Sequence, residues 1–241
     1  MSLLSGLSTP ADVAEEKDTL GGGQYQVDSG VYDALIEYAF VEKNDKGTLM
    51  LHLGAKLDNG FDLKQRIALT KRTGETFYTT KSGEKFPMSG FVVGEAIALF
   101  GAQKQLSELA TKPSVVKLYS KEHKKEMPQE VPMITDLLNK PIKLGLKKII
   151  KPSGSYDSDG KWVEDQSKTF TFNEIDKVFH PKSGLTVPEI RSKKTEPEFL
   201  EAWKAKWDGK VDDQTDGTAA SADTASTTSG SESSVSSLFR N

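Results

Sequence analysis

The chain has 241 residues, of which 36% are apolar, 28% are charged and none is cysteine. The lack of cysteine excludes disulfide bonds, thiolate nucleophiles, thiolate zinc sites and iron–sulfur clusters. Its apolar runs are shorter than the roughly 20 residues of a membrane-spanning helix. We therefore expect one large domain or two small ones, without a transmembrane segment or a secretion signal.

The net charge of −3 hides an uneven distribution along the chain. Residues 1–24 contain four acidic residues and one lysine, and residues 208–241 contain six acidic and two basic residues. Residues 112–151, in contrast, contain ten lysines and four acidic residues. A basic middle between acidic ends favours a nucleic-acid partner, because local basic segments matter more for such binding than the total charge does.

Both ends of the chain are predicted to lie outside the folded domain. Residues 1–24 are expected to form a flexible arm with a short helix that begins near Thr9. Residues 210–241 are expected to form a disordered, acidic, Ser- and Thr-rich tail, since Ser, Thr, Ala and Gly fill 18 of the 21 positions from 217 to 237. We interpret Leu238 and Phe239 at its end as a docking motif for a partner protein, with an inert solubilising tail as the alternative.

The first half of the domain, which we predict over residues 25–209, has the pattern of β-strands. In residues 31–42 one parity is wholly apolar, and we assign its side chains to the core: Tyr32, Ala34, Ile36, Tyr38 and Phe40. Residues 49–56 and 61–69 alternate with a period of two around a turn at 58–60, which predicts an antiparallel hairpin. The opposite face of this hairpin carries Lys64 and Arg66.

Between residues 70 and 110 the pattern changes twice. Residues 70–90 predict a long, exposed, basic and aromatic loop that contains Lys71, Arg72, Phe77, Tyr78, Lys81 and Phe86. Residues 91–110 have helical spacing, and Pro113 is expected to stop the helix.

Strands are predicted again after residue 114. In residues 115–121 one parity is formed by Lys117, Tyr119 and Lys121. Residues 141–151 are expected to bury Ile142, Leu144, Leu146 and Ile150, and to direct Lys143 and Lys147 the opposite way. Residues 196–207 predict a closing helix. Three strands, a helix and further strands are the order of an OB-type barrel, so we expect a mainly β, five-stranded, antiparallel OB-like fold with an inserted loop.

Catalytic chemistry is not indicated by any motif. The three histidines are far apart in sequence, and neither a phosphate-binding glycine loop nor a pair of carboxylates at catalytic spacing is present. We expect no enzymatic activity, no metal and no cofactor.

The cationic and aromatic residues named above are instead typical of single-strand binding, in which lysines and arginines meet phosphates and aromatic rings stack on unpaired bases. The alternative for each residue is that outward lysines only solvate a sheet and that Phe77, Phe86 and Tyr119 belong to a core. A second hypothesis is a protein-interaction module that docks on replication or transcription machinery through its termini.

Several stretches of the chain resemble bacteriophage single-stranded DNA-binding proteins of replication modules. The similarity covers about residues 24–209 and is carried by residues 21–60, by VPMITDLLNKPIKLGLKKI, and by FNEIDKVFHPKSGLTVPEI followed by EFLEAWKAKWDGK. It implies an OB fold, sequence-independent binding and protection of single-stranded DNA during replication and recombination, and contacts with phage or host replication proteins. It also implies that the protein works in the cytoplasm of a bacterial host.

Overall fold

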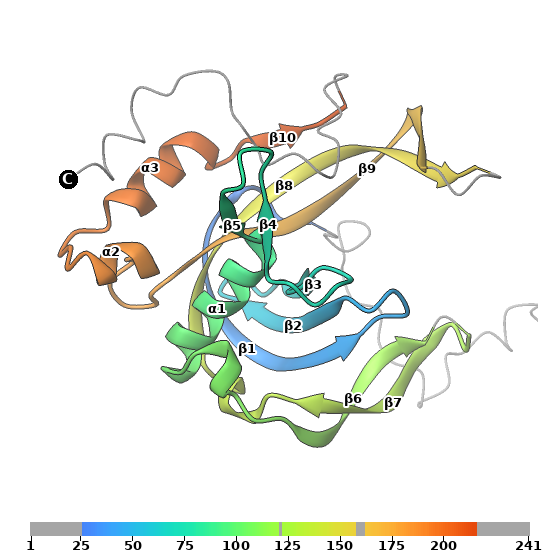
Figure 1. Cartoon of the computed structure of the whole chain (residues 1–241), viewed down its shortest axis with the longest axis horizontal. Helices are drawn as coiled ribbons and strands as arrows, with labels where there is room; N and C mark the ends of the chain where they lie inside the picture. The colour runs from blue at the N-terminus through green and yellow to red at the C-terminus, as the bar shows by residue number, and fades with distance from the viewer. Residues whose placement is uncertain (1–25, 121, 158–161, 216–241) are drawn as a thin grey trace, which may run out of the picture.

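The computed structural model describes residues 26–120, 122–157 and 162–215, and this part of the chain is mainly β with a few helices (Figure 1). The elements are β1 (Gly30–Lys43), β2 (Leu49–Leu57), β3 (Asp62–Ala68), β4 (Phe77–Thr79), β5 (Lys85–Pro87), α1 (Ser89–Ala102), β6 (Lys112–Ser120), β7 (Lys125–Met133), β8 (Pro141–Tyr156), β9 (Trp162–Phe179), α2 (Val187–Arg191), α3 (Glu198–Trp207) and β10 (Val211–Asp213), with 3-10 turns at Leu106–Glu108 and Thr135–Leu137.

Eight of these strands form one sheet. Its main path runs β10-β8-β1-β2-β3, and β9 pairs with the other side of β8. The β6–β7 hairpin joins the sheet where Met133 pairs with Phe40, whereas β4 and β5 form a separate two-stranded sheet. No backbone ladder links β3 to β9 among the described strands, and the Gln65 side chain bridges them by donating from Nε2 to the Asn173 carbonyl at 2.7 Å. The sheet is therefore open at this seam.

The predicted hairpin of residues 49–56 and 61–69 is confirmed as β2 and β3. Its turn depends on Gly60, whose φ of +86° lies in the left-handed region that glycine adopts without strain. His52 pairs with Arg66, and Gly54 with Lys64. Directly opposite residues of an antiparallel pair share a face, so Lys64 and Arg66 lie on the side away from the core, as predicted.

The prediction that Tyr38 and Phe40 share a face with Ile36 is wrong. Ile36 pairs with Ala55, but Tyr38 pairs with the next residue of β2, Gly54, so Glu37 is an extra residue in β1. A β-bulge of this kind reverses the alternation of all side chains that follow it. Tyr38 and Phe40 are thereby directed to the face of the sheet away from the core, which we call the outer face.

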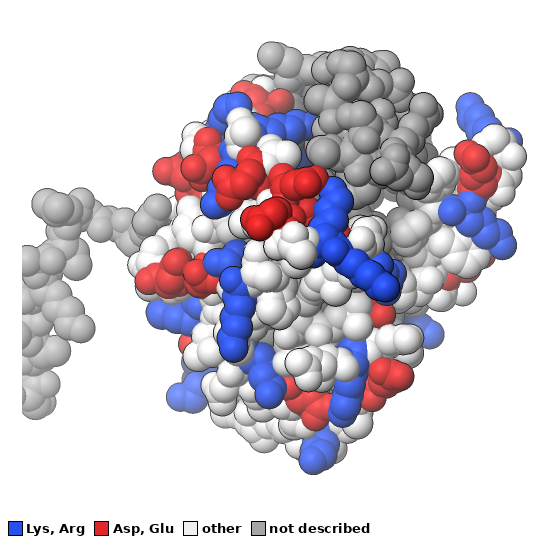
Figure 2. Space-filling view, turned by 90° about the vertical axis from the view of Figure 1, so that its left-hand side faces the viewer, with Lys and Arg blue, Asp and Glu red and all other residues white. Residues whose placement is uncertain are grey.

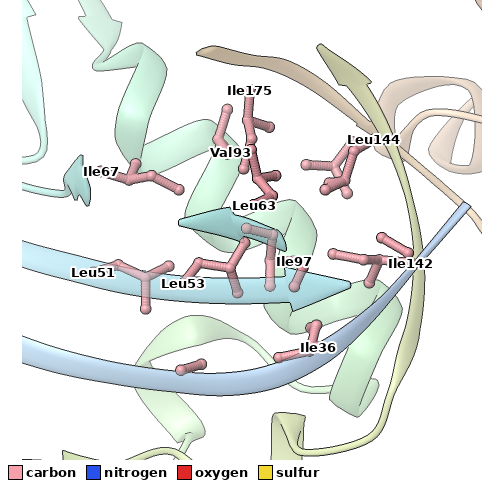
Figure 3. Packing of buried hydrophobic residues seen from close by; sticks show 14 of the residues in the cluster. Ile36, Leu51, Leu53, Leu63, Ile67, Val93, Ile97, Ile142, Leu144 and Ile175 are labelled. Atoms are coloured by element: carbon pink, nitrogen blue, oxygen red, sulfur yellow. The ribbon is translucent and has the colours of Figure 1, made fainter. Parts of the chain in front are cut away.

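The main core lies between the inner face of the curved sheet and helix α1. Figure 3 shows that side chains from β1, β2, β3, α1, β8 and β9 point toward one another in this layer. Helix α1 ends eight residues before the predicted limit, because Gln103 adopts a left-handed conformation with φ of 57° and its N–H bonds to the Leu99 carbonyl. The helix covers the inner face and leaves the outer face to the β6–β7 hairpin.

Strand β8 begins as predicted but runs five residues further, and its core pattern changes part of the way along. The prediction that Ile150 is buried is wrong: Ile149 is buried instead, and it shares the parity of Lys147 and Lys151. Beyond the part of β8 that pairs with β1, residues 149–156 and 162–172 project from the body as a two-stranded extension, which we call the β8–β9 arm (Figure 1).

The C-terminal elements fix the end of the described chain. Helix α3 confirms the predicted helix at 196–207, with Trp203 buried and Trp207 packed on the same cluster as Phe179. Residues 211–213, which were predicted to belong to the tail, form β10, parallel to residues 148–150 of β8. Lys121, the predicted N-terminal arm and the docking residues Leu238 and Phe239 lie outside the described residues. No helix within the described ranges is long and apolar enough to cross a membrane.

Candidate nucleic-acid interface

A groove of about 460 Å³ lies between the outer face of β1–β3 and the β6–β7 hairpin. Val131 and Met133 of the hairpin pack on Phe40, and this small cluster holds the hairpin against the sheet. The groove is lined by Glu37, Tyr38, Gly54, Lys56, Asp62, Leu63, Lys64, Val116, Lys117 and Glu126. Its walls therefore combine an aromatic ring with alternating cations and carboxylates.

Tyr38 is the aromatic side chain of the groove, and its position depends on Gly54. A Cβ atom on Gly54 would lie 2.1 Å from Cε1 of Tyr38, so the ring occupies the space that any other residue would fill. Burial raises the pKa of the Tyr38 phenol, while the nearby Lys64 opposes that shift. The phenol therefore remains protonated at neutral pH and can donate a hydrogen bond.

Two lysines of the groove are held by carboxylates. Lys56 Nζ lies 2.6 Å from Asp62 Oδ1 across the β2–β3 pair. Lys64 Nζ lies 3.3 Å from Glu126 Oε1, which links β3 to the β6–β7 hairpin. All four side chains are substantially exposed, so both pairs are weak and a phosphate group can compete for the lysines.

Arg66 is the strongest cation candidate on the outer face. It stands directly opposite His52, and none of the ion pairs in the described part of the chain involves it. His52 stacks on Phe40 with the ring centroids 4.4 Å apart and the planes tilted by 16°, and its Nε2 lies 3.0 Å from Glu42 Oε2. Arg66 is thus beside a stacked pair of rings and keeps its guanidinium group available.

The pKa of His52 is lowered, first by burial and then by the Arg66 charge. As the pH falls through the unfolded-state pKa of about 6.5, the unfolded chain takes up the proton before the folded chain does. We therefore expect the free energy of unfolding to decrease as the pH falls below about 6.5 and this decrease to stop below the folded-state pKa. Urea denaturation of wild type and His52→Gln across this range measures the effect, and an identical pH dependence in both proteins would contradict it.

The predicted basic loop contains the β4–β5 hairpin. Tyr78 and Phe86 stack with centroids 5.8 Å apart, and Lys85 Nζ lies 4.8 Å from the Phe77 ring centroid. Lys71 pairs with Glu75, and Arg72 and Lys81 lie in the turns that flank β4. Phe77, Phe86 and Tyr119 belong to none of the buried clusters in the described chain, so the alternative that they form a core is not supported.

Lys117 and Tyr119 are on the side of β6 that faces away from the sheet, and Tyr119 is 62% exposed. Val116 and Leu118, with the opposite parity, pack on the cluster around Phe40. Lys117 reaches the rim of the groove, whereas Tyr119 stands beyond it near the end of the strand.

Lys143 and Lys147 are not brought to this groove. Lys143 Nζ lies 2.5 Å from Asp33 Oδ1. Lys147 Nζ lies 3.4 Å from Asp176, 3.7 Å from Asp212 and 3.8 Å from the centroid of the Trp207 ring. On the side of the molecule that carries the helices, acidic and basic side chains are interspersed (Figure 2). These two lysines thus neutralise carboxylates around β8 and contribute little to an anion-binding surface.

Sequence reasoning missed Tyr38 as a member of the groove, because nothing in the alternation of residues 31–42 marks the bulge at Glu37. It also left out Phe170 and Phe172, although two phenylalanines that alternate with threonines indicate one aromatic face of a strand.

No group of three or more potential metal ligands occurs among the described residues. No protein-family model matches the chain, and no curated protein is significantly similar to it.

Proposed function

We propose that the sheet is an OB-type barrel left open between β3 and β9, and that the protein binds single-stranded DNA without reading its sequence. The strand order β3-β2-β1-β8-β9, with α1 inserted between β3 and β8, supports the proposed fold, because OB folds combine a five-stranded Greek-key barrel with an oligonucleotide-binding strand face.

The observation that carries the proposed function is the groove that holds Tyr38 between Lys56, Lys64 and Lys117. Unpaired bases stack on aromatic rings for about 1–3 kcal/mol each, and cations along the same groove bind the phosphates. Every base has an aromatic face, so this arrangement is tolerant of sequence. Such a protein would coat and protect exposed single strands during replication or recombination.

The test is a fluorescence-anisotropy titration of the full-length protein with a labelled oligothymidylate and with a duplex of equal length. We expect the single strand to bind more tightly, and its affinity to fall as salt rises, because phosphate contacts release counterions. Equal affinity for both DNAs, or no binding to either, would reject the proposal.

Glu126 is expected to limit the affinity of the groove. Its carboxylate occupies Lys64 and repels a phosphate at the same place. Glu126→Gln should therefore tighten binding of the oligothymidylate at low salt by up to about fivefold, the range expected for an exposed ion pair. Glu130→Gln is the matched control, since this exposed residue of β7 has no ion pair within the described residues. An unchanged affinity in Glu126→Gln would show that Lys64 does not meet phosphate.

A further inference from the structure

The β8–β9 arm carries a second basic and aromatic surface. Phe170 and Phe172 alternate along β9 and share one face. Lys168 comes two residues before Phe170, in the stretch of residues 166–168 that has no partner in β8. Lys151 of β8 pairs with Phe170 in the antiparallel register, which places it on the same face. We call these four residues the arm patch.

The two phenylalanines of the arm patch form an ordered stack. Their ring centroids are 5.4 Å apart and their planes differ by 21°, and Lys151 Nζ lies 5.4 Å from the centroid of Phe172. Phe172 is partly buried and pairs with Ile149, which is buried. Phe170 is nevertheless 47% exposed. The inner ring thus supports the stack, and the outer ring remains accessible to a planar ligand.

Charge changes sign along this face of β9. Toward the body of the molecule, the residues of β9 with the same parity are Glu174 and Asp176. Burial raises the pKa of the Glu174 carboxyl group. Lys151 lies beside Phe170 on this face, and Lys168 follows toward the tip of the arm, where its Nζ is 3.5 Å from Asp165 Oδ2 and its side chain is largely exposed. The arm beyond Lys168 also carries Glu164 and Asp165, so an anionic ligand is favoured only between Lys151 and Lys168 and is disfavoured near the body.

We propose that the arm patch is a second contact for single-stranded DNA, separate from the groove that holds Tyr38. This inference rests on the proposed function. A base stacks on the exposed side of Phe170, and the flanking phosphates meet Lys151 and Lys168. Residues that alternate on a strand are about 6.6 Å apart, so the patch presents cation and ring within the reach of one or two nucleotides. None of the four residues lines the groove, so a strand must extend beyond the groove to contact both surfaces.

The experiment compares oligothymidylates of about 6 and about 30 nucleotides, which bracket the ~4–16 nucleotides that one OB fold covers. Phe170→Ala is expected to weaken binding of the long oligonucleotide about tenfold and to leave the short one unchanged, while Phe170→Tyr retains wild-type affinity. Val163→Ala, at another exposed apolar position of β9, is the control and should bind like wild type. Thermal melting by circular dichroism checks that the variants are folded.

A second measurement does not depend on affinity. A long oligothymidylate that contains 5-iododeoxyuridine is irradiated with the full-length protein, and the crosslinked peptides are identified by mass spectrometry. A crosslink at Phe170 supports the proposal. The arm patch is rejected if Phe170→Ala binds the long oligonucleotide like wild type and no crosslink forms in β9. The proposed function still stands in that case, provided that the wild type binds DNA and that Tyr38→Ala weakens this binding. If the wild type binds neither oligonucleotide, the proposed function itself fails.

Discussion

Replacing Trp203 with alanine is expected to lower the free energy of unfolding by about 3–5 kcal/mol, the range for loss of a buried aromatic side chain. Trp203 is 4% exposed and meets the edge of Phe179 at a centroid distance of 6.4 Å. Its Nε1–H donates to Asp176 Oδ2 at 2.7 Å. The variant therefore creates a cavity between α3 and β8 and removes a hydrogen bond from a carboxylate that also holds Lys147.

Urea denaturation followed by circular dichroism measures this loss. Trp203→Phe should be intermediate, because it keeps most of the apolar contact and loses the N–H donor. Trp207→Ala is the matched control one helical turn away, and a smaller effect is expected there, since Trp207 is only partly buried. Equal losses for Trp203→Ala and Trp207→Ala would contradict the assignment of Trp203 as the anchor of α3.

The second large effect concerns DNA. Tyr38→Ala should weaken binding of an oligothymidylate about tenfold, because it removes the base-stacking ring of the groove, while Tyr38→Phe should retain most of the affinity.

Arg66→Ala should weaken binding of the oligothymidylate and reduce the slope of log affinity against log salt by about 1, the signature of one lost phosphate contact. Lys182→Ala is the control for charge, since this exposed residue of the turn after β9 has no ion pair in the described ranges.

The two variants separate the two contributions. If Tyr38→Ala loses affinity without a change of the salt slope, the Tyr38 ring stacks on a base. If Arg66→Ala has a reduced salt slope, the Arg66 guanidinium binds a phosphate. Wild-type affinity in both variants would place the DNA elsewhere on the molecule.

The hairpin of β2 and β3 and the faces of its side chains were predictable, because a period-two pattern around a glycine turn specifies both the strands and their register. The outward positions of Lys64, Arg66, Lys117 and Tyr119 follow from the same alternation. Helix α3 was predictable from the helical spacing of Leu200 and Trp203, both of which are buried.

Other features depend on contacts that are distant in sequence. The bulge at Glu37 is visible only in the pairing of β1 with β2, and it decides that Tyr38 faces the groove. Strand β7 was not predicted. It contains Pro128 and Pro132, which sheets accept mainly at their edges, and it pairs mainly with β6 and only at one end with β1. The partners of Lys147 come from β9, β10 and α3, so its neutralisation could not be read from residues 141–151.

The position of β10 also changes how the predicted tail must be tested. A truncation at residue 210 would remove a strand that pairs with β8 and a carboxylate that faces Lys147. A truncation after Thr215 keeps every described residue and removes Leu238 and Phe239. Loss of partner capture without loss of DNA binding in that variant would support the predicted docking role of the tail.

The most direct test of the central claim is hydrogen–deuterium exchange of the full-length protein with and without a saturating oligothymidylate. Strands β3 and β6 each pair along one side only in the described sheet, so their free amides are sensitive reporters of an occupied groove. We predict slower exchange in β2–β3 and in the β6–β7 hairpin, and no change in α2 and α3. Protection confined to the helices, or none anywhere at saturation, would contradict the account.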